Sequence, residues 1–446
     1  MRLALLFLSS ILFGTVSVPA QPPSASDQIP NLANLPDRTE ELRKLVRDSD
    51  GSLMPKAGIY RITETIEIRL NQSRTTAISA TKGPVTLIMD GPGPAIRLIG
   101  SHQGSASHKS FDPSTWNESM PLIDGIEIVG NHPEADGIEL IQCMAPTITR
   151  VSVRWCRHGI RLSHRNRNVA ISSVHLYENS GVGLFLDEVN LHQINVSNSH
   201  ISYNRGGGIV VRDGNVRNLH ITGCDIEANM PADDSPTITA NVFLDLSNSI
   251  GDKSHSIAEV SITGCTIQHS SNYAGKAFES LAPGGANIRI LGKKIWPIDS
   301  VAINGNVISD TSVLVDIHHA TDISLTGNTF FAPNPDFLHL ENSQRIIITG
   351  NTFNPRQFKR PGRLIFKNCQ DSILTNCTLR GLEATEGTVI IDNCSRINLN
   401  GNILSESNSG VLIRKSKGIT VKNWLVSGLP EETPLIVSDA ESEVTR

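Results

Sequence analysis

The chain has 446 residues, of which 39% are hydrophobic and 19% charged, and its formal net charge is −5. This acidic total makes nucleic acid a poor partner, because phosphate backbones attract basic surfaces. Aromatic residues make up 4% of the chain, so side chains on which neutral sugars could stack are few.

The first twenty residues have the pattern of a secretory signal peptide. Arg2 precedes an apolar run from Leu3 to Val16, and small residues lead up to Ala20. The run is short for a bilayer span, which favours cleavage after Ala20 over a membrane anchor. No later stretch is apolar enough to cross a membrane. We therefore expect residues 1–20 to be removed and the mature protein to be extracytoplasmic, either periplasmic or secreted.

A short helix is expected next. Residues 21–36 are rich in Pro, Ser and Asn and are typical of a flexible lead-in. Residues 37–51 then begin with Asp37 and Glu40 at capping-box spacing and continue as an amphipathic segment. A helix here would cover the end strands of a repeat array, whose free edges would otherwise pair with other chains.

Residues 57–429 are dominated by one recurring phrase. Nine copies alternate apolar and polar residues and start at Ile171, Val196, Ile221, Ile262, Ile303, Leu325, Ile348, Leu374 and Leu399. Most follow one another after 22 to 26 residues, and two spacings are 41. A period in the low twenties indicates stacked repeats, none of which can bury its apolar face alone.

A second alternating phrase precedes each copy, as in "GIEL" at Gly137 and "GIRL" at Gly159. Two or three short strands per repeat, joined by Asn, Gly, Ser and Asp corners, describe one coil of a parallel β-helix. The predicted fold is therefore all-β, a single-domain solenoid of about a dozen coils, followed by a polar tail at 430–446.

Two residue types support this stacking. Asparagines recur at matching corners and would form amide ladders along the axis; they are Asn248, Asn342, Asn368, Asn393, Asn306, Asn328, Asn351 and Asn402. Of the seven cysteines, Cys369 and Cys394 occupy equivalent places in successive repeats, as do Cys224 and Cys265. This favours small residues stacked in the interior. Their spacing matches no zinc site.

These patterns resemble the right-handed parallel β-helix proteins of the pectin-lyase-like superfamily. That superfamily includes polysaccharide lyases, polygalacturonase-type hydrolases, uronate epimerases, phage spikes and non-catalytic surface proteins, so the resemblance implies a fold and leaves the activity open. "ADGIEL" around Asp136 is similar to the polygalacturonase strand whose Asp is an acid/base residue, and "HG" at His158 to their His-Gly. The paired-Asp and Arg-x-Lys motifs of those enzymes are missing.

The outward residues of the "GIxL" strands would form one long row. In chain order we expect Glu139, Arg161, Phe185, Val210, Asp245, Arg289, Asp316, His339, Ile365, Ile390 and Leu412. A face that is polar at one end is typical of a saccharide groove. The aliphatic end would be covered by a loop or the tail, because it forms an apolar patch.

A cationic stretch lies between residues 150 and 168, where six arginines and two histidines occur without an acid. Such a cluster on an acidic protein suggests an anionic ligand. The alternative is that these arginines pair with acids on neighbouring coils, such as Asp136, Glu139 and Asp187.

This stretch and its neighbours supply the predicted site. The catalytic candidates are Asp136, His158, Arg161, His164 and Asp187, and the substrate-binding candidates are Glu139, Arg165, Tyr177, Tyr203, Arg205 and Asp213. Coils ~4.8 Å apart would place Asp136 and Asp187 roughly 9–10 Å from each other, near the limit for inverting hydrolysis. No metal site is predicted, and no cofactor is assigned.

The inventory favours a reaction in which a proton is abstracted from an acidic polysaccharide. Arginines bind carboxylates, histidines can act as bases near neutral pH, and tyrosines can protonate a leaving oxygen. We therefore predict a monomeric lyase or epimerase. Two alternatives stay open: a polygalacturonase-like hydrolase, and a non-catalytic β-helix that binds glycan at a cell surface.

Overall fold

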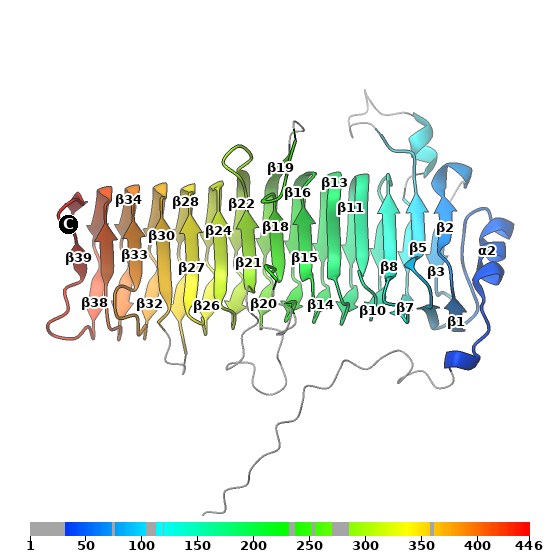
Figure 1. Ribbon diagram of the computed structural model, residues 1–446, viewed down its shortest axis with the longest axis horizontal. Coiled ribbons are helices and arrows are strands. Elements are labelled where there is room, and N and C mark those ends of the chain that lie inside the picture. The colour runs from blue at the N-terminus through cyan, green and yellow to red at the C-terminus, as the bar shows by residue number, and fades with distance from the viewer. Residues whose placement is uncertain are drawn as a thin grey trace, which may run out of the picture.

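The computed structural model describes residues 32–73, 76–103, 113–118, 120–231, 237–251, 255–269, 285–356 and 361–446. The predicted signal peptide at 1–20 and most of the lead-in at 21–36 lie outside these residues. The described chain forms one long stack of parallel coils (Figure 1). In this part of the chain no helix has the length and apolar character needed to span a membrane.

Each coil contributes strands to three parallel sheets. Sheet 1 consists of β2 (Ile66–Arg69), β5 (Gly93–Ile99), β8 (Ala135–Ile141), the first parts of β11 (Ile160–Ser172) and β13 (Val182–Ser197), β15 (Gly207–Arg212), β18 (Val242–Asp245), β21 (Ala286–Leu291), β24 (Val313–His318), β27 (Asp336–Glu341), β30 (Arg363–Lys367), β33 (Val389–Asp392), β36 (Val411–Arg414) and β39 (Ile436–Ser438).

Sheet 2 consists of β3 (Ala77–Ser79), β6 (Leu122–Asp124), β9 (Thr147–Thr149), the second parts of β11 and β13, β16 (Asn215–Thr222), β19 (Ser256–Thr263), β22 (Ile298–Asn304), β25 (Ala320–Thr326), β28 (Gln344–Thr349), β31 (Gln370–Thr375), β34 (Ser395–Asn400), β37 (Lys417–Lys422) and β40 (Val444–Thr445).

Sheet 3 consists of β1 (Gly58–Ile62), β4 (Val85–Met89), β7 (Ile126–Gly130), β10 (Ser152–Arg154), β12 (His175–Tyr177), β14 (His200–Ser202), β17 (Asp225–Glu227), β20 (Thr266–Gln268), β23 (Val307–Ser309), β26 (Thr329–Phe331), β29 (Thr352–Asn354), β32 (Thr378–Arg380), β35 (Ile403–Ser405) and β38 (Leu425–Ser427). Its 14 strands exceed the dozen coils expected from the sequence.

Period-2 alternation explains the core. Ile138, Ile160 and Leu184 are aligned in the sheet 1 register, and each is completely buried. The repeat phrases end the sheet 2 strands and begin the sheet 3 strands, so their apolar residues stack in the same interior. Each new coil thus buries the apolar side of the coil before it, which is the main stabilising term of a solenoid.

The corners carry amide ladders built from most of the predicted asparagines, but Cys377 separates Asn351 from Asn402, and Asn248 is exposed and joins no ladder among the described residues. The Nδ2 group of Asn306 donates to Asn328, and that of Asn328 donates to Asn351, each over 3.0 Å. All seven cysteines are buried and unpaired, as expected for stacked interior residues. A further ladder was not predicted from the sequence and joins Asn179, Asn204, Asn229, Asn241 and Asn287 between sheets 3 and 1.

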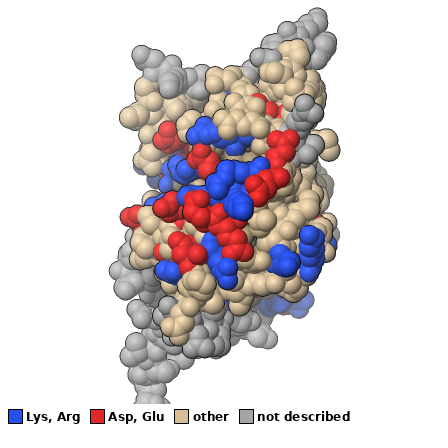
Figure 2. Space-filling model, turned by 90° about the vertical axis from the view of Figure 1, so that its right-hand side faces the viewer, with Lys and Arg blue, Asp and Glu red and all other residues tan. Residues whose placement is uncertain are grey.

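The N-terminal end of the stack is covered by the expected helix, α2 (Thr39–Asp48), whose Leu42 is fully buried. Three short 3₁₀ helices, η1 (Leu32–Asn34), η2 (Leu70–Gln72) and η3 (Pro113–Glu118), lie in the same half of the chain. Basic and acidic side chains are mixed over this end (Figure 2), including the pair of Arg61 and Asp90 at 2.6 Å. A charged cap of this kind opposes edge-to-edge pairing.

Residues 430–446, expected as a polar tail beyond the solenoid, contain two further strands. β39 pairs with β36 and β40 pairs with β37, so coils continue beyond Leu429. Val437 aligns with Leu412 and thereby extends the aliphatic end of the sheet 1 row. The tail is polar in composition, but its few apolar residues in β39 and β40 align with apolar residues of the preceding coil.

Candidate functional site

The predicted cationic stretch pairs with acids across coils. Asp136 is 4% exposed and accepts hydrogen bonds from Arg157 at 3.0 and 2.7 Å. Arg161 donates to Asp187 at 2.6 Å and to Glu139 at 3.1 Å. These contacts follow the second of the two interpretations of the stretch, in which arginines and acids neutralise one another.

The pairing extends one coil further toward the cap. Arg97 donates to the other oxygen of Glu139 over 2.6 Å, so both oxygens of that buried carboxylate are occupied by arginines. Arg150 pairs with Asp124, and Arg154 with Glu127. The local charge is therefore much closer to neutral than the sequence of residues 150–168 suggests.

His158 is held as a neutral ring. The backbone N–H of Val182 donates to its Nδ1 atom over 3.1 Å, which places the ring proton on Nε2. Burial lowers the pKa of His158, although the nearby Asp136 opposes this. In this state Nε2 carries the ring proton, and His158 cannot serve as the base predicted from the sequence without a change of tautomer.

The remaining predicted residues are spread over several corners and faces. His164 is exposed, and Arg165 follows it at the bend between sheets 1 and 2. Tyr177 ends a sheet 3 strand, whereas Tyr203 and Arg205 lie at the next corner, and the Tyr203 hydroxyl faces Glu227 at 3.5 Å. Asp213 accepts a hydrogen bond from Ser249. The roles predicted for all of these residues stay predictions.

The expected separation of Asp136 and Asp187 is wrong. Asp136 aligns with His158 at the start of the sheet 1 strands, whereas Asp187 aligns with Ser163 at their end. The two positions are therefore five residues apart along the strand direction, roughly 16 Å at 3.3 Å per residue, in addition to being two coils apart. The sequence estimate counted coils and ignored this displacement.

The outward row also differs at one position. Phe243, and not Asp245, aligns with Val210 and Arg289. Phe185, Val210 and Phe243 consequently form a buried apolar cluster on the outer side of sheet 1, with Val182, Ala240 and Ala286 around it. This cluster divides the paired charges of the N-terminal coils from a second polar group.

That second group combines two imidazoles and two carboxylates on β24 and β27, and we call it the acid–imidazole cluster: Asp316, His318, His339 and Glu341. The Oδ1 atom of Asp316 lies 2.8 Å from His318 Nε2 and 3.3 Å from His339 Nδ1. Arg289 donates to the other oxygen, Oδ2, over 2.8 Å. The outer nitrogens of the two rings face Glu341 at 3.7 and 3.9 Å.

Burial and pairing set the electrostatics of this cluster. Burial would raise the pKa of Asp316, but hydrogen bonds from His318 and His339 and the charge of Arg289 outweigh it and hold the pKa well below its usual value. The hydrogen bond to Asp316 raises the pKa of His339 against the effect of burial. Asp316 therefore stays ionised while both imidazole side chains, 25% and 30% exposed, remain accessible.

The sequence contains a signal for this cluster. "VDIH" and "FLHLE" place Asp316 with His318, and His339 with Glu341, at alternate positions of consecutive coils. Alternate strand residues share a face, and equivalent residues of adjacent coils are neighbours. The prediction named Asp316 and His339 as part of the row but did not include the next residues along each strand.

Side chains that could bind a metal ion also come together in this cluster. Within the described residues, one donor atom each from Asp316, His318 and His339 lie within 4.8 Å of one another, a spacing that could hold an ion. In the structure the same Asp316 oxygen accepts from both imidazoles, and these hydrogen bonds define the chemistry considered below.

Comparison with known proteins places the chain by its fold. A family model described as a right-handed beta helix region matches residues 114–249 and 251–426. No curated protein matches the sequence.

Several solved structures are similar at low identity. The A-module of the Azotobacter vinelandii mannuronan C-5 epimerase AlgE4 is 12% identical over 92% of this chain and 96% of that chain, with a TM-score of 0.44. A tailspike protein of Escherichia coli bacteriophage HK620, solved with a pentasaccharide, is 12% identical over 90% and 77%, with a TM-score of 0.44. PfbA, a surface adhesin of Streptococcus pneumoniae, is 10% identical over 87% and 88%, with a TM-score of 0.42.

Similarity at this level concerns architecture, and these proteins differ in activity. The family model, in contrast, spans the coils from β6 to β38. The three-sheet coils and the low-twenties period agree with it. The chain belongs to the right-handed beta helix family.

Proposed function

We propose that the protein acts on an acidic polysaccharide by proton transfer at a sugar carbon beside a carboxylate, as lyases and epimerases do. The observation that carries this proposal is the acid–imidazole cluster, in which two solvent-accessible imidazoles share one buried, ionised carboxylate oxygen. Such an arrangement orients both rings and fixes which nitrogen of each ring faces outward.

The two rings suit different halves of the reaction. His339 is the proton donor, because the contact with Asp316 stabilises its protonated form. His318 directs Nε2 to Asp316, and Nδ1, 3.7 Å from Glu341, is the nitrogen that accepts a proton when the ring is neutral. The ring centroids are 5.1 Å apart, so a sugar ring against the cluster can meet both. A lyase uses the donor for the leaving oxygen, whereas an epimerase returns a proton to the same carbon.

The hydrolytic alternative has less support. Inverting hydrolysis needs two carboxyl groups roughly 6.5–9.5 Å apart on opposite sides of the bond. Asp136 and Asp187 are displaced along the strands, and their oxygens are engaged by Arg157 and Arg161. Non-catalytic glycan binding is the remaining alternative, and the accessible imidazoles make it the weaker one.

Product analysis separates these possibilities. The purified protein is incubated with pectate, alginate and a glycosaminoglycan, and the reaction is followed by ultraviolet absorbance and by reducing ends. Absorbance from an unsaturated uronate identifies a lyase, and a changed C5 configuration without absorbance identifies an epimerase. New reducing ends without absorbance would replace the proposal with hydrolysis, and no change on any polymer would favour binding alone.

We also propose that the protein is exported and acts on polymers outside the cytoplasm. The support is the signal-peptide pattern of residues 1–20. The amino terminus of the mature protein should be Gln21. A mature chain that still begins at Met1 would contradict export by this signal.

A further inference from the structure

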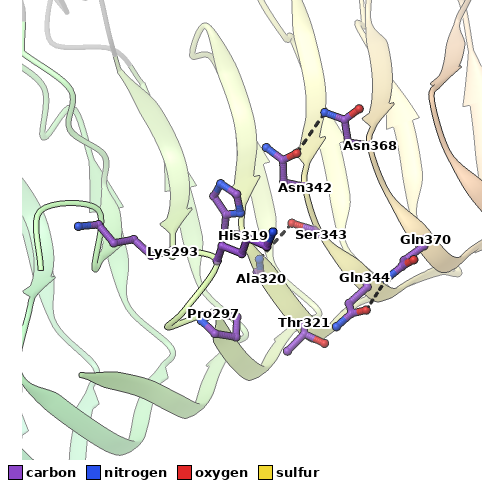
Figure 3. A pocket seen from close by; sticks show the side chains of 11 residues that line it. Lys293, Pro297, His319, Ala320, Thr321, Asn342, Ser343, Gln344, Asn368 and Gln370 are labelled. Carbon is purple, nitrogen blue, oxygen red and sulfur yellow. Dashed lines mark hydrogen bonds between the residues drawn. The ribbon is translucent and has the colours of Figure 1, made fainter. Parts of the chain in front are cut away.

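A groove of about 450 Å³ lies beside the acid–imidazole cluster, at the corner where sheet 1 turns into sheet 2 (Figure 3). Its volume is in the range of small-ligand sites, roughly 300–1,000 Å³. The loop between β21 and β22 forms one wall, with Lys293 and Lys294, and the corners after β24, β27 and β30 form the rest, with His319, Thr321, Asn342 and Gln344 among the lining residues.

The groove and the cluster are consecutive in the chain. His318 of the cluster immediately precedes His319 of the groove, and Glu341 immediately precedes Asn342. A ligand that extends along the corner therefore reaches the cluster within one or two residues of the backbone.

The lining is basic although the protein is acidic overall. It contains Lys293 and Lys294 and no Asp or Glu. The Nζ atom of Lys293 donates to the carbonyl of Ser249 over 2.5 Å, which fixes it in the wall, while Lys294 is exposed. The groove therefore carries a local positive charge in a chain of net charge −5, a field that attracts anions.

The side-chain amides at the groove are all oriented the same way along the stack of coils. Asn393 donates to Asn368, and Asn368 donates to Asn342 over 3.1 Å. Gln370 likewise donates to Gln344 over 2.6 Å. Each carbonyl faces the following coil, so both ladders end with an NH₂ group at Asn342 and Gln344. Figure 3 shows these two nitrogens on the side of His319 and Thr321, away from the ladders.

Aligned amides therefore present donor ends to a groove that has two lysines and lacks carboxylates. An NH₂ group has two donors and no acceptor, and donors bind ionised oxygens more strongly than neutral ones. Hydroxyl-rich neutral sugars need acceptors as well as donors. The groove thus matches an acid group better than a neutral sugar.

We infer that this groove is a binding subsite for the carboxylates of an oligouronate, which Lys294 and the NH₂ ends of Asn342 and Gln344 bind at separate positions along the corner. The inference rests on the proposed function for its choice of a polysaccharide as the source of the carboxylate. It adds the residues that bind the acid groups, and it places the polymer along the corner, with its acid groups facing the ladder ends.

Binding is measured by calorimetry, using oligogalacturonate and oligoalginate and the same oligosaccharides with their carboxyls reduced to alcohols. The variant Asn342→Asp keeps the oxygen that accepts from Asn368 and replaces the NH₂ by a second carboxylate oxygen. Asn376→Asp is the matched control, because both residues are exposed and both have φ of 52°, and Asn376 does not line the groove.

At least one oligouronate should bind the unaltered protein, and Asn342→Asp should weaken it tenfold or more, with a larger effect at low salt. Lys294→Gln should weaken it several-fold, and Asn376→Asp should change it less than twofold. Equal affinity for the reduced oligosaccharides, or unchanged affinity in Asn342→Asp and Lys294→Gln, would overturn the subsite.

The same titrations are repeated with His339→Gln, so that binding at the groove is tested separately from the proposed reaction. Selective uronate binding without turnover in the unaltered protein would leave the subsite standing and remove the reaction. Turnover by the unaltered protein, together with undiminished binding affinity in Asn342→Asp, would leave the proposed reaction standing and remove the subsite. Tighter binding of a sulfated glycosaminoglycan than of any carboxylated oligomer would overturn the assignment to carboxylate.

Discussion

At the residue scale, the proposed site depends on Asp316, which Arg289 and two imidazoles hold in its ionised form. Both members of the Asp316–Arg289 pair are buried, at 7% exposure each. Removing one partner of such a pair leaves the other charge uncompensated. The stability of this part of sheet 1 therefore depends on residues that the proposed chemistry also uses.

Asp316→Asn should lower the free energy of unfolding by about 2–5 kcal/mol at pH 7. Because the folded pKa of Asp316 is depressed, its contribution is present above its unfolded pKa and is lost as pH falls below about 4. Urea denaturation at pH 7 and at pH 3.5 measures both effects. Asp371→Asn is the control, since it removes an exposed pair with Arg396 and should change stability little. Equal effects of the two variants would contradict the role of burial.

His339 should show the opposite dependence on pH. Its folded pKa is raised by Asp316, so its contribution is complete below the unfolded value of about 6.5 and is lost as pH rises through the folded value. The difference in unfolding free energy between the unaltered protein and His339→Gln should therefore shrink between pH 6 and pH 9. A difference that stays constant or grows over this interval would argue against the Asp316 contact.

Residue-level detail is also where prediction from sequence was weakest. Arg157 and Arg161 could be recognised as a cationic stretch, but their partners Asp136 and Asp187 depend on the register between coils. The alternation of "FLDL" could be assigned in two ways, and Asp245 was placed where Phe243 lies. To predict the cluster of His318 with His339, it would be necessary to know which strand positions face outward side by side.

At the element scale, the corners determine how coils stack. Asn328 accepts from the backbone N–H and the Nδ2 of Asn306, and it donates to the carbonyl of Ile303. The ladder was predictable because "GN" recurs at a fixed place in the repeat. The ladder through Asn179 and Asn204 was not predicted, because its members follow less regular phrases.

Asn328→Ala should cost about 3 kcal/mol or more, since it leaves several buried donors and acceptors without partners at about 1–3 kcal/mol each. Thermal or urea unfolding measures the loss. Thr329→Ala, which changes the exposed neighbouring residue, is the control and should have a small effect. If the two variants unfold alike, the ladder contributes little beyond the backbone.

At the scale of the whole molecule, the fold follows from the repeat, and the sequence predicted it well. The period determines the coils, alternation determines the buried side, and the amphipathic segment at α2 covers one end. What the repeat cannot predict is where polar residues interrupt the outer face, because any outward position tolerates many side chains. The site had to be found from side-chain contacts.

Ile221→Asp tests the common core. Ile221 is fully buried and aligned between Val196 and Ile262, so an unpaired carboxylate there costs several kcal/mol and should prevent folding. Solubility and circular dichroism report the outcome. Thr222→Asp changes the exposed neighbour and should leave a cooperative, folded protein. A soluble Ile221→Asp protein that melts cooperatively would count against the stacking.

In the proposed function the acid–imidazole cluster transfers a proton at C5 of a uronate. The most direct measurement is deuterium incorporation at C5 when the polymer is incubated with the protein in D₂O. A lyase incorporates deuterium at C5 only if proton abstraction reverses before elimination. Deuterium incorporation is therefore measured together with the amount of unsaturated product.

We predict exchange or elimination on at least one uronate polymer, reduced by about 10²–10⁴ in His339→Gln and unaffected in His200→Gln, whose exposed ring stacks on His175 in sheet 3. Equal activity of both variants and the unaltered protein, or no C5 chemistry on any uronate polymer, would contradict the account.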